Sequence, residues 1–163
     1  MNFYQSLGYL VFGSRLKRLS ESFINDVNAV YKNHKIPFDA SWFPVFYILS
    51  QKKEVSIREI SDELNITHSA ASQLVSGLQE KGLIKSAVSK IDARHKVVKF
   101  TAKGEKLLEK IKPVWNALQK AMEQLMLENN YTKKILDNLT ELEKNISKKS
   151  LLQRIELMMS VDA

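Results

Sequence analysis

The sequence predicts a mostly α-helical protein that carries one small β-hairpin. Apolar residues recur at helical spacing over most of the 163 residues, and only 5 Gly and 3 Pro interrupt them. The exception is the stretch 83–101, where two short segments of strand-like composition flank a polar, basic loop. With 44% hydrophobic residues, the chain can bury the core of one domain, or of a domain with dimerising extensions.

The N-terminal part is expected to be helical before a proline interrupts it. Apolar residues recur at helical spacing within residues 2–33, and Pro37 ends this region. A second helix is expected to begin near Asp39 or Ser41, because either side chain can cap it, and to run to Leu49.

Two short amphipathic helices follow, joined by a tight connection. The first begins with a capping box, in which Ser56 and Glu59 satisfy each other's end of the first turn, and it ends at Asn65. Thr67 is the expected N-cap of the second, which stops at Gly82, a residue suited to the positive φ of a helix end.

The second of these helices has an exposed face that is polar but uncharged. It carries no acidic residue or lysine before Glu80, although those residues are common on solvated helix faces. The Gln73 amide can form a pair of hydrogen bonds with the N6 and N7 atoms of adenine. Serine hydroxyls can donate hydrogen bonds to phosphates or base edges. The alternative is a face turned to plain solvent. The candidate contact residues here are Thr67, His68, Ser69, Ser72, Gln73 and Ser76.

The loop of the hairpin, residues 89–95, offers a second contact element. Arg94 at its tip could enter a minor groove, where narrow A·T stretches concentrate negative potential. Asp92 would orient this arginine by a charge-assisted hydrogen bond. Alternatively, the two form an exposed pair worth about 0–1 kcal/mol. Lysines on and beside the strands complete the set: Lys85, Lys90 and Lys96.

The C-terminal part is expected to consist of two helices. Thr101 caps a long helix whose apolar residues step by three and four over 108–125, a spacing suited to packing along another helix. Pro113 predicts a kink or a break within it. A last helix is expected from about Thr132 through Ile155. The predicted division is an N-terminal dimerisation helix (1–36), a central region (37–104) and C-terminal dimerisation helices (105–163).

The net charge of +7 originates in one segment of the chain. Residues 81–112 hold 10 basic and 3 acidic residues, while the remainder holds 15 of each. A Lys-rich solvated surface would explain such a composition, but its position beside the helix pair favours a surface that faces phosphates.

The sequence lacks the residues that several classes of function require. The chain has no Cys and only three His, on different predicted elements, so we expect no catalytic residue, no metal site and no cofactor. No apolar run approaches the roughly 18 residues of a membrane span. A cytoplasmic protein without membrane contact is therefore expected.

The motifs together resemble the MarR family of winged helix-turn-helix transcriptional regulators. They are the helices 56–64 and 67–81, the Lys81-Gly82-Leu83-Ile84 that follows, Asp92-x-Arg94, and Phe100-Thr101-x-x-Gly104. The resemblance implies a homodimer, formed by the N- and C-terminal helices, that binds double-stranded DNA at a pseudo-palindromic operator. It also implies small-molecule effectors that bind between the dimerisation and DNA-binding parts.

The chain departs from the family pattern at three positions that often carry arginine. It has Ser86-Ala87 after the start of the first strand, Ala93 in the loop and Ser72-Gln73 in the second short helix. Nearby lysines can attract phosphates but cannot reproduce the bidentate geometry of arginine.

The leading hypothesis is a homodimeric, sequence-specific regulator of transcription, most simply a repressor that a small effector relieves. The alternative is a winged-helix module that binds a protein partner without specific DNA binding. The aromatic residues of the second helix could line an effector crevice, although they would equally suit an ordinary core: Trp42, Phe43, Phe46 and Tyr47.

Overall fold

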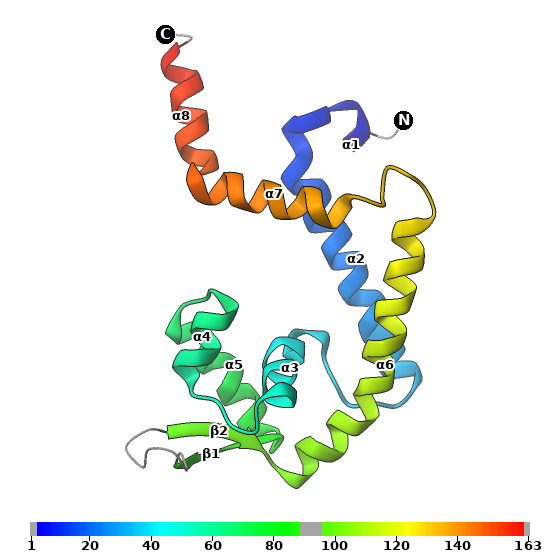
Figure 1. Ribbon diagram of the computed structural model, residues 1–163, viewed down its shortest axis with the longest axis vertical. Helices are drawn as coiled ribbons and strands as arrows, with labels where there is room; N and C mark the ends of the chain where they lie inside the picture. Colours follow the sequence, from blue (N-terminus) through cyan, green and yellow to red (C-terminus); the bar gives the residue numbers. More distant parts are fainter. Residues whose placement is uncertain (1–2, 89–95, 162–163) are drawn as a thin grey trace. The chain divides into compact units, whose positions relative to one another are not determined.

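The computed structural model describes residues 3–88 and 96–161, and it confirms a mostly helical chain with one antiparallel hairpin (Figure 1). The chain divides into two compact units, Met1–Asn116 and Ala117–Ala163. The elements, in order, are α1 (Phe3–Ser6), the 3-10 helix η1 (Gly8–Val11), α2 (Phe12–Asn33), the 3-10 helix η2 (Ala40–Trp42), α3 (Phe43–Gln51), α4 (Ile57–Leu64), α5 (His68–Glu80), β1 (Ile84–Val88), β2 (Lys96–Phe100), α6 (Ala102–Leu127), α7 (Ile135–Lys148) and α8 (Leu151–Val161).

The hairpin gains a third backbone partner from the segment before α4. β1 and β2 pair in antiparallel register from Ile84 opposite Phe100 to Val88 opposite Lys96. Val55 then bridges Val98, with the two amides donating to the opposite carbonyls over 3.1 and 2.8 Å. The hairpin and the start of α4 are therefore fixed to each other.

The helix caps predicted around α4 and α5 are present. Glu59 accepts a hydrogen bond from the Ser56 amide (2.8 Å), and the Glu59 amide donates to the Ser56 hydroxyl (3.1 Å). The backbone bond from Ser56, aided by its hydroxyl, lowers the pKa of the Glu59 carboxyl. Asn65 ends α4 in the left-handed conformation (φ 50°), and Thr67 caps α5 by accepting from the Ala70 amide at 3.2 Å.

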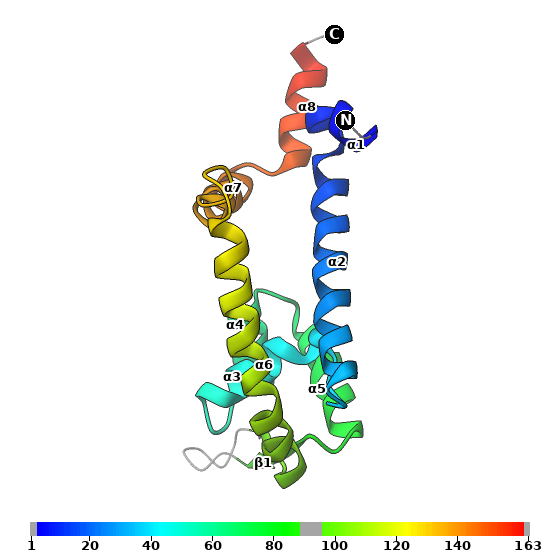
Figure 2. The ribbon, with the colours of Figure 1, turned by 90° about the vertical axis from the view of Figure 1, so that its right-hand side faces the viewer.

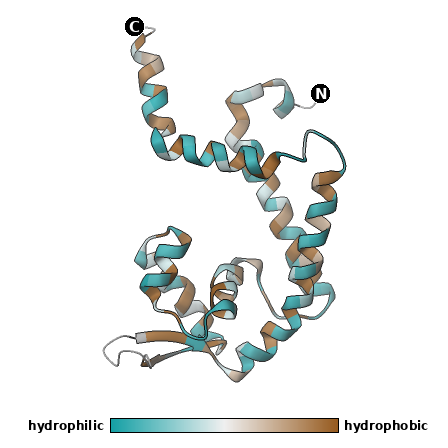
Figure 3. Cartoon of the chain, viewed as in Figure 1, coloured by the Kyte–Doolittle hydropathy of each residue, from teal (hydrophilic) through white to brown (hydrophobic). Residues whose placement is uncertain are grey.

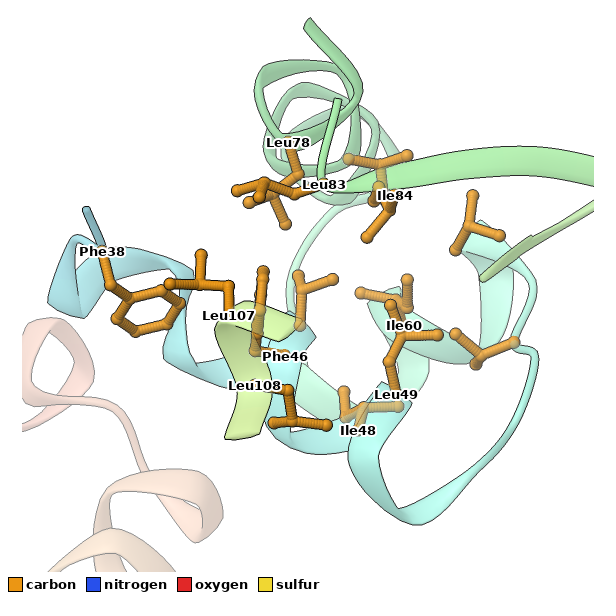
Figure 4. Close-up of a cluster of buried hydrophobic side chains, with 14 of the residues drawn as sticks. Phe38, Phe46, Ile48, Leu49, Ile60, Leu78, Leu83, Ile84, Leu107 and Leu108 are labelled. Atoms are coloured by element: carbon orange, nitrogen blue, oxygen red, sulfur yellow. The ribbon is translucent and has the colours of Figure 1, made fainter. Parts of the chain in front are cut away.

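The hydrophobic core lies among α3, α4, α5, the hairpin and the first turns of α6 (Figure 4). Phe46 and Ile60 are fully buried at its centre, and Leu107 and Leu108 of α6 close one side. The end of α2 joins this core through Tyr31, whose hydroxyl accepts a hydrogen bond from Trp115 Nε1 at 3.1 Å. Burial raises the pKa of the Tyr31 hydroxyl above its ordinary value.

Three helix boundaries differ from the sequence-based expectation. The N-terminal helical region is interrupted at Gly8 (φ +54°), so α2 begins only at Phe12 and then runs as one long helix (Figure 2). Asp39 caps the short η2, and α3 follows with Pro44 in its first turn, where the missing amide hydrogen costs nothing. The predicted last helix is two helices, α7 and α8.

The separation of α7 from α8 has a local cause. The Ser150 hydroxyl accepts a hydrogen bond from the Gln153 amide (3.2 Å), and the Ser150 amide donates to the Gln153 side chain (2.9 Å), which is a second capping box.

Pro113 does not break the long helix that contains it. Helix α6 continues through this proline from Ala102 to Leu127.

Long apolar side chains are exposed on α2, α7 and α8. Hydrophobic and hydrophilic stretches alternate along α2, α7 and α8 (Figure 3). In α2, Leu16 and Leu19 are exposed, and α7 and α8 contain no buried residue. Within residues 3–88 and 96–161, no helix is long and apolar enough to cross a membrane.

Candidate nucleic-acid interface

α5 presents its polar face outward because its apolar face is buried in the core. Ala71, Val75 and Leu78 are at most 1% exposed and fix which side of the helix points inward. On the opposite side, His68, Ser69, Gln73, Ser76 and the cap residue Thr67 are exposed, and Ser72 is half-buried. Helix α5 thus offers a row of hydroxyl, amide and imidazole groups that can both donate and accept hydrogen bonds.

A tight turn joins α4 to the start of α5. Asn65 in the left-handed conformation reverses the chain, and the Ile66 amide then donates to the Ser61 carbonyl at 3.0 Å. Buried side chains at Ile60 and Ala71 hold the two helices together. This arrangement is a helix-turn-helix, a motif whose second helix enters the major groove in known DNA-binding proteins.

The other end of α5 is held by the residues that begin α6. Gly82 ends the helix at φ +67°, and its carbonyl accepts a 2.7 Å hydrogen bond from the Thr101 hydroxyl. The same hydroxyl caps α6 by accepting from the Gly104 amide at 3.1 Å. No side chain fits at Gly104, since a Cβ there would overlap the Leu83 carbonyl oxygen. One threonine therefore ties the end of α5 to the start of α6.

A side-chain contact also ties α5 to the hairpin. Gln79 Nε2 donates to the Ser86 hydroxyl over 2.8 Å. Ser86 is, with Ala87, one of the two strand positions at which the family resemblance predicts an arginine. In this chain the position serves a bond within the protein, a role that the sequence pattern did not indicate.

Only some of the basic residues predicted for the wing lie within the residues that the structure describes. Lys85 is exposed on β1, and Lys96 is the first residue of β2. Lys90, Asp92 and Arg94 lie outside the residues that the structure describes. The pairing of Asp92 with Arg94 therefore stays a prediction.

The four aromatic residues predicted to line an effector crevice lie in three different settings. Phe46 is fully buried in the core. Phe43 and Tyr47 are 40% and 48% exposed, and both pack against Trp115, with ring centroids 5.0 and 6.0 Å from it. Trp42, at the end of η2, is half-buried and lines a groove with residues of α5 and α6. An effector site made by all four stays a prediction.

The described side chains offer no other chemical centre that stands out. Across residues 3–88 and 96–161, no three His, Asp or Glu side chains come close enough to hold a metal ion. The pKa of Glu59 is lowered by its capping bonds, and the pKa of Lys52 is raised by its hydrogen bond to Glu63. Glu59 thus serves the cap of α4, and Lys52, which follows α3, contacts Glu63 of α4.

A helix-turn-helix followed by a two-stranded wing defines this chain as a winged-helix protein. A family model described as MarR family matches residues 37–95, which span α3 to the wing loop. No curated protein matches the chain in sequence.

Solved structures share the fold over most of the chain. The S. aureus MepR–DNA complex matches with a TM-score of 0.69 and 18% identity over 83% of this chain and 97% of that one. A mutant E. coli MarR complexed with operator DNA gives 0.65 and 16%, over 86% and 97%. The M. tuberculosis regulator MOSR in complex with DNA gives 0.64 and 16%, over 82% and 96%. The winged-helix segment of this chain, residues 37–95, therefore resembles the MarR family, and the solved structures share its fold.

Proposed function

We propose that this protein is a sequence-specific, double-stranded DNA-binding regulator of transcription. The observation that carries the proposal is the exposed polar face of α5, held at both ends by caps and fixed on its inner side by the core. Side chains on such a helix reach base edges only if the helix is rigidly placed. Three similar structures, those of MepR, MarR and MOSR, were solved as complexes with DNA.

The chemistry of the face assigns different roles to α5 and to its basic flank. Gln73 is exposed near the middle of the helix and can pair with adenine through its amide, while Ser69 and Ser76 lie one turn away on either side. None of these groups is charged, so attraction to phosphates must come from elsewhere. The hairpin and the start of α6 supply it, because residues 81–112 hold the entire net positive charge.

The exposed apolar helices support a homodimer as the acting form. Leucines on α2 remain exposed, and so do most of the large apolar side chains of α7 and α8, which a single copy leaves in water. A two-fold dimer would place two α5 helices on half-sites roughly 10 bp apart, which requires a pseudo-palindromic operator. Following the family resemblance, we propose that the dimer represses its target and that a small effector releases it.

Selection of bound duplexes from a random pool by the full-length protein tests the proposal. We expect an enriched sequence with two-fold symmetry and half-sites about one helical turn apart. Gln73→Ala should then weaken binding to the selected duplex by about 1–3 kcal/mol and leave binding to random duplex unchanged. Gln51→Ala, at the exposed end of α3, is the matched control and should change neither.

The duplex selection can also contradict the regulator proposal. If no duplex binds more tightly than random DNA at moderate salt, the regulator proposal is wrong. Recovery of a protein partner whose binding depends on Gln73 would then identify a winged-helix interaction module, a reading that the uncharged α5 face also allows.

A further inference from the structure

Within the part of the chain that the structure describes, one side-chain hydrogen bond joins α5 to the wing strands β1 and β2. At the root of the wing the backbone makes the connection, because the Gly82 amide donates to the Gln79 carbonyl at 2.8 Å. Leu83 and Ile84 are buried beside this turn. Farther along β1, the Gln79 side chain reaches out and its Nε2 donates to the Ser86 hydroxyl at 2.8 Å.

The outer part of β1 has no anchor in the hydrophobic core. Beyond Ile84, no side chain of β1 is buried, and Val88 at the end of the strand is 62% exposed. In β2, by contrast, Val97 and Val98 are both buried. Two-stranded ribbons twist more than larger sheets do. Burial alone therefore does not set the angle between the outer part of β1 and α5.

The bond from Gln79 meets the hairpin at the level where the segment before α4 also holds it. Ser86 is the register partner of Val98. Val98 in turn exchanges two backbone hydrogen bonds with Val55, directly before the cap of α4. The hairpin is thus held on two sides at one level, through β2 by the backbone before α4 and through β1 by a side chain of α5.

Gln79 belongs to the polar row of α5. It shares one face of the helix with three serines, at spacings of three and four residues: Ser69, Ser72 and Ser76. The row that begins with candidate base contacts therefore ends in a bond to the wing. Neither Gln79 nor Ser86 is charged, so the bond adds no long-range attraction to phosphates. Its effect on DNA binding has to come through geometry.

We propose that Gln79 and Ser86 are positioning residues, whose hydrogen bond fixes the angle between α5 and the wing so that both contact one duplex without rearrangement. The inference rests on the function proposed above. A surface already held in its bound geometry loses less conformational freedom on binding. Where the family resemblance predicts an arginine that would bind phosphate, this chain orders the wing from within.

Hydrogen–deuterium exchange of the full-length protein, resolved by mass spectrometry, tests the first step without DNA. Gln79→Ala and Ser86→Ala each remove one partner, so the amides of β1 should exchange at least about threefold faster. Gln51→Ala is the matched control, because Gln51 Nε2 donates to the Ser50 hydroxyl at 3.0 Å, an exposed bond of the same type within α3. It should leave β1 unchanged. Unchanged exchange in Gln79→Ala and Ser86→Ala as well would overturn the proposal.

Affinity for the duplex selected as above tests the second step. Gln79→Ala and Ser86→Ala should each weaken its binding by about three- to tenfold, the range for one lost hydrogen bond. Faster dissociation should account for the loss, since an uncharged pair does not steer association. Binding to random duplex should stay within about twofold, because it depends on the attraction of lysines to phosphates. Equal losses on both duplexes would overturn the proposal.

A double-mutant cycle separates positioning from direct contact with DNA. If the two side chains act through one bond, the double variant should lose no more affinity than either single variant. Ser86→Thr keeps the hydroxyl and suits a strand, so it should retain the unmodified affinity and exchange. Losses that add, or a Ser86→Thr protein as weak as Ser86→Ala, would overturn the proposal. If no duplex is preferred over random DNA, the regulator proposal fails, while exchange in β1 still decides whether Gln79 holds the wing.

Discussion

Replacing Gly104 by alanine should destabilise the junction that holds the end of α5. Gly104 lies in the first turn of α6, where a Cβ would overlap the carbonyl oxygen of Leu83 and come within 2.9 Å of Phe100 Cδ1. The Leu83 carbonyl is backbone, and it accepts hydrogen bonds from both the amide and the hydroxyl of Thr101. Relief of the overlap therefore requires α6 to shift away from the turn after α5.

The size of the effect follows from two opposing terms. Overpacking of a well-packed site costs about 1–3 kcal/mol, and a clash with backbone belongs at the upper end of that range. Alanine gains at most about 1 kcal/mol over glycine in a helix. The net loss in the free energy of unfolding is therefore about 2 kcal/mol. With a urea dependence of about 1–3 kcal/mol/M, the unfolding midpoint should fall by roughly 1 M.

Gly77→Ala is the matched control for this measurement. Gly77 is also helical, in α5, and nothing lies within 4 Å of the position where its Cβ would be. It should be neutral or stabilise by up to about 1 kcal/mol. Both variants are unfolded in urea at the same protein concentration, because dimerisation would contribute to stability. A Gly104→Ala protein as stable as the unmodified one would show that α6 accommodates a Cβ at this position without loss.

Four further outcomes are expected. Ser56→Ala removes the cap of α4 and should cost about 1 kcal/mol in urea unfolding. Because the folded pKa of Glu59 lies below its ordinary 4.5, its stabilisation is present above that pH and is lost as the pH falls through the folded pKa. Glu59→Gln should therefore flatten this part of the stability–pH curve, and an unchanged curve would contradict the assignment. Trp115→Phe leaves the buried Tyr31 hydroxyl without its donor and should cost about 1–3 kcal/mol, with a double-mutant cycle against Tyr31→Phe as the check. Lys85→Gln should reduce the slope of log affinity for DNA against log salt by about 1, and an unchanged slope would remove Lys85 from the interface.

Local signals in the sequence were sufficient for the helix-turn-helix. Ser56 with Glu59, Asn65, Thr67 and Gly82 each act within one turn of the chain, so their roles follow from neighbouring residues alone. The alternation of apolar and polar residues then indicated which face of α5 would be buried. These predictions are confirmed because caps and amphipathic faces depend little on the rest of the molecule.

Other helix boundaries also have local signals in the sequence. Ser150-x-x-Gln153 has the spacing of a capping box, and it starts α8 where one continuous helix was expected. Gly8, which interrupts the N-terminal helical region, gives a weaker indication, because glycine is tolerated within helices as well as at their ends. The course of α6 through Pro113 was also open, since a proline can bend a helix without ending it.

The fold class, the exposed polar face of α5 and the concentration of positive charge in residues 81–112 follow from the sequence alone, because all three depend on periodicity, capping and composition. Where those charges meet could not be predicted from the sequence. In the folded chain, Lys32 of α2, Lys81 after α5 and Lys106 of α6 line one groove, and Gln79 donates a hydrogen bond to Ser86. A groove and a side-chain hydrogen bond require residues far apart in sequence to come together, and packing of the core, not local propensity, sets those distances.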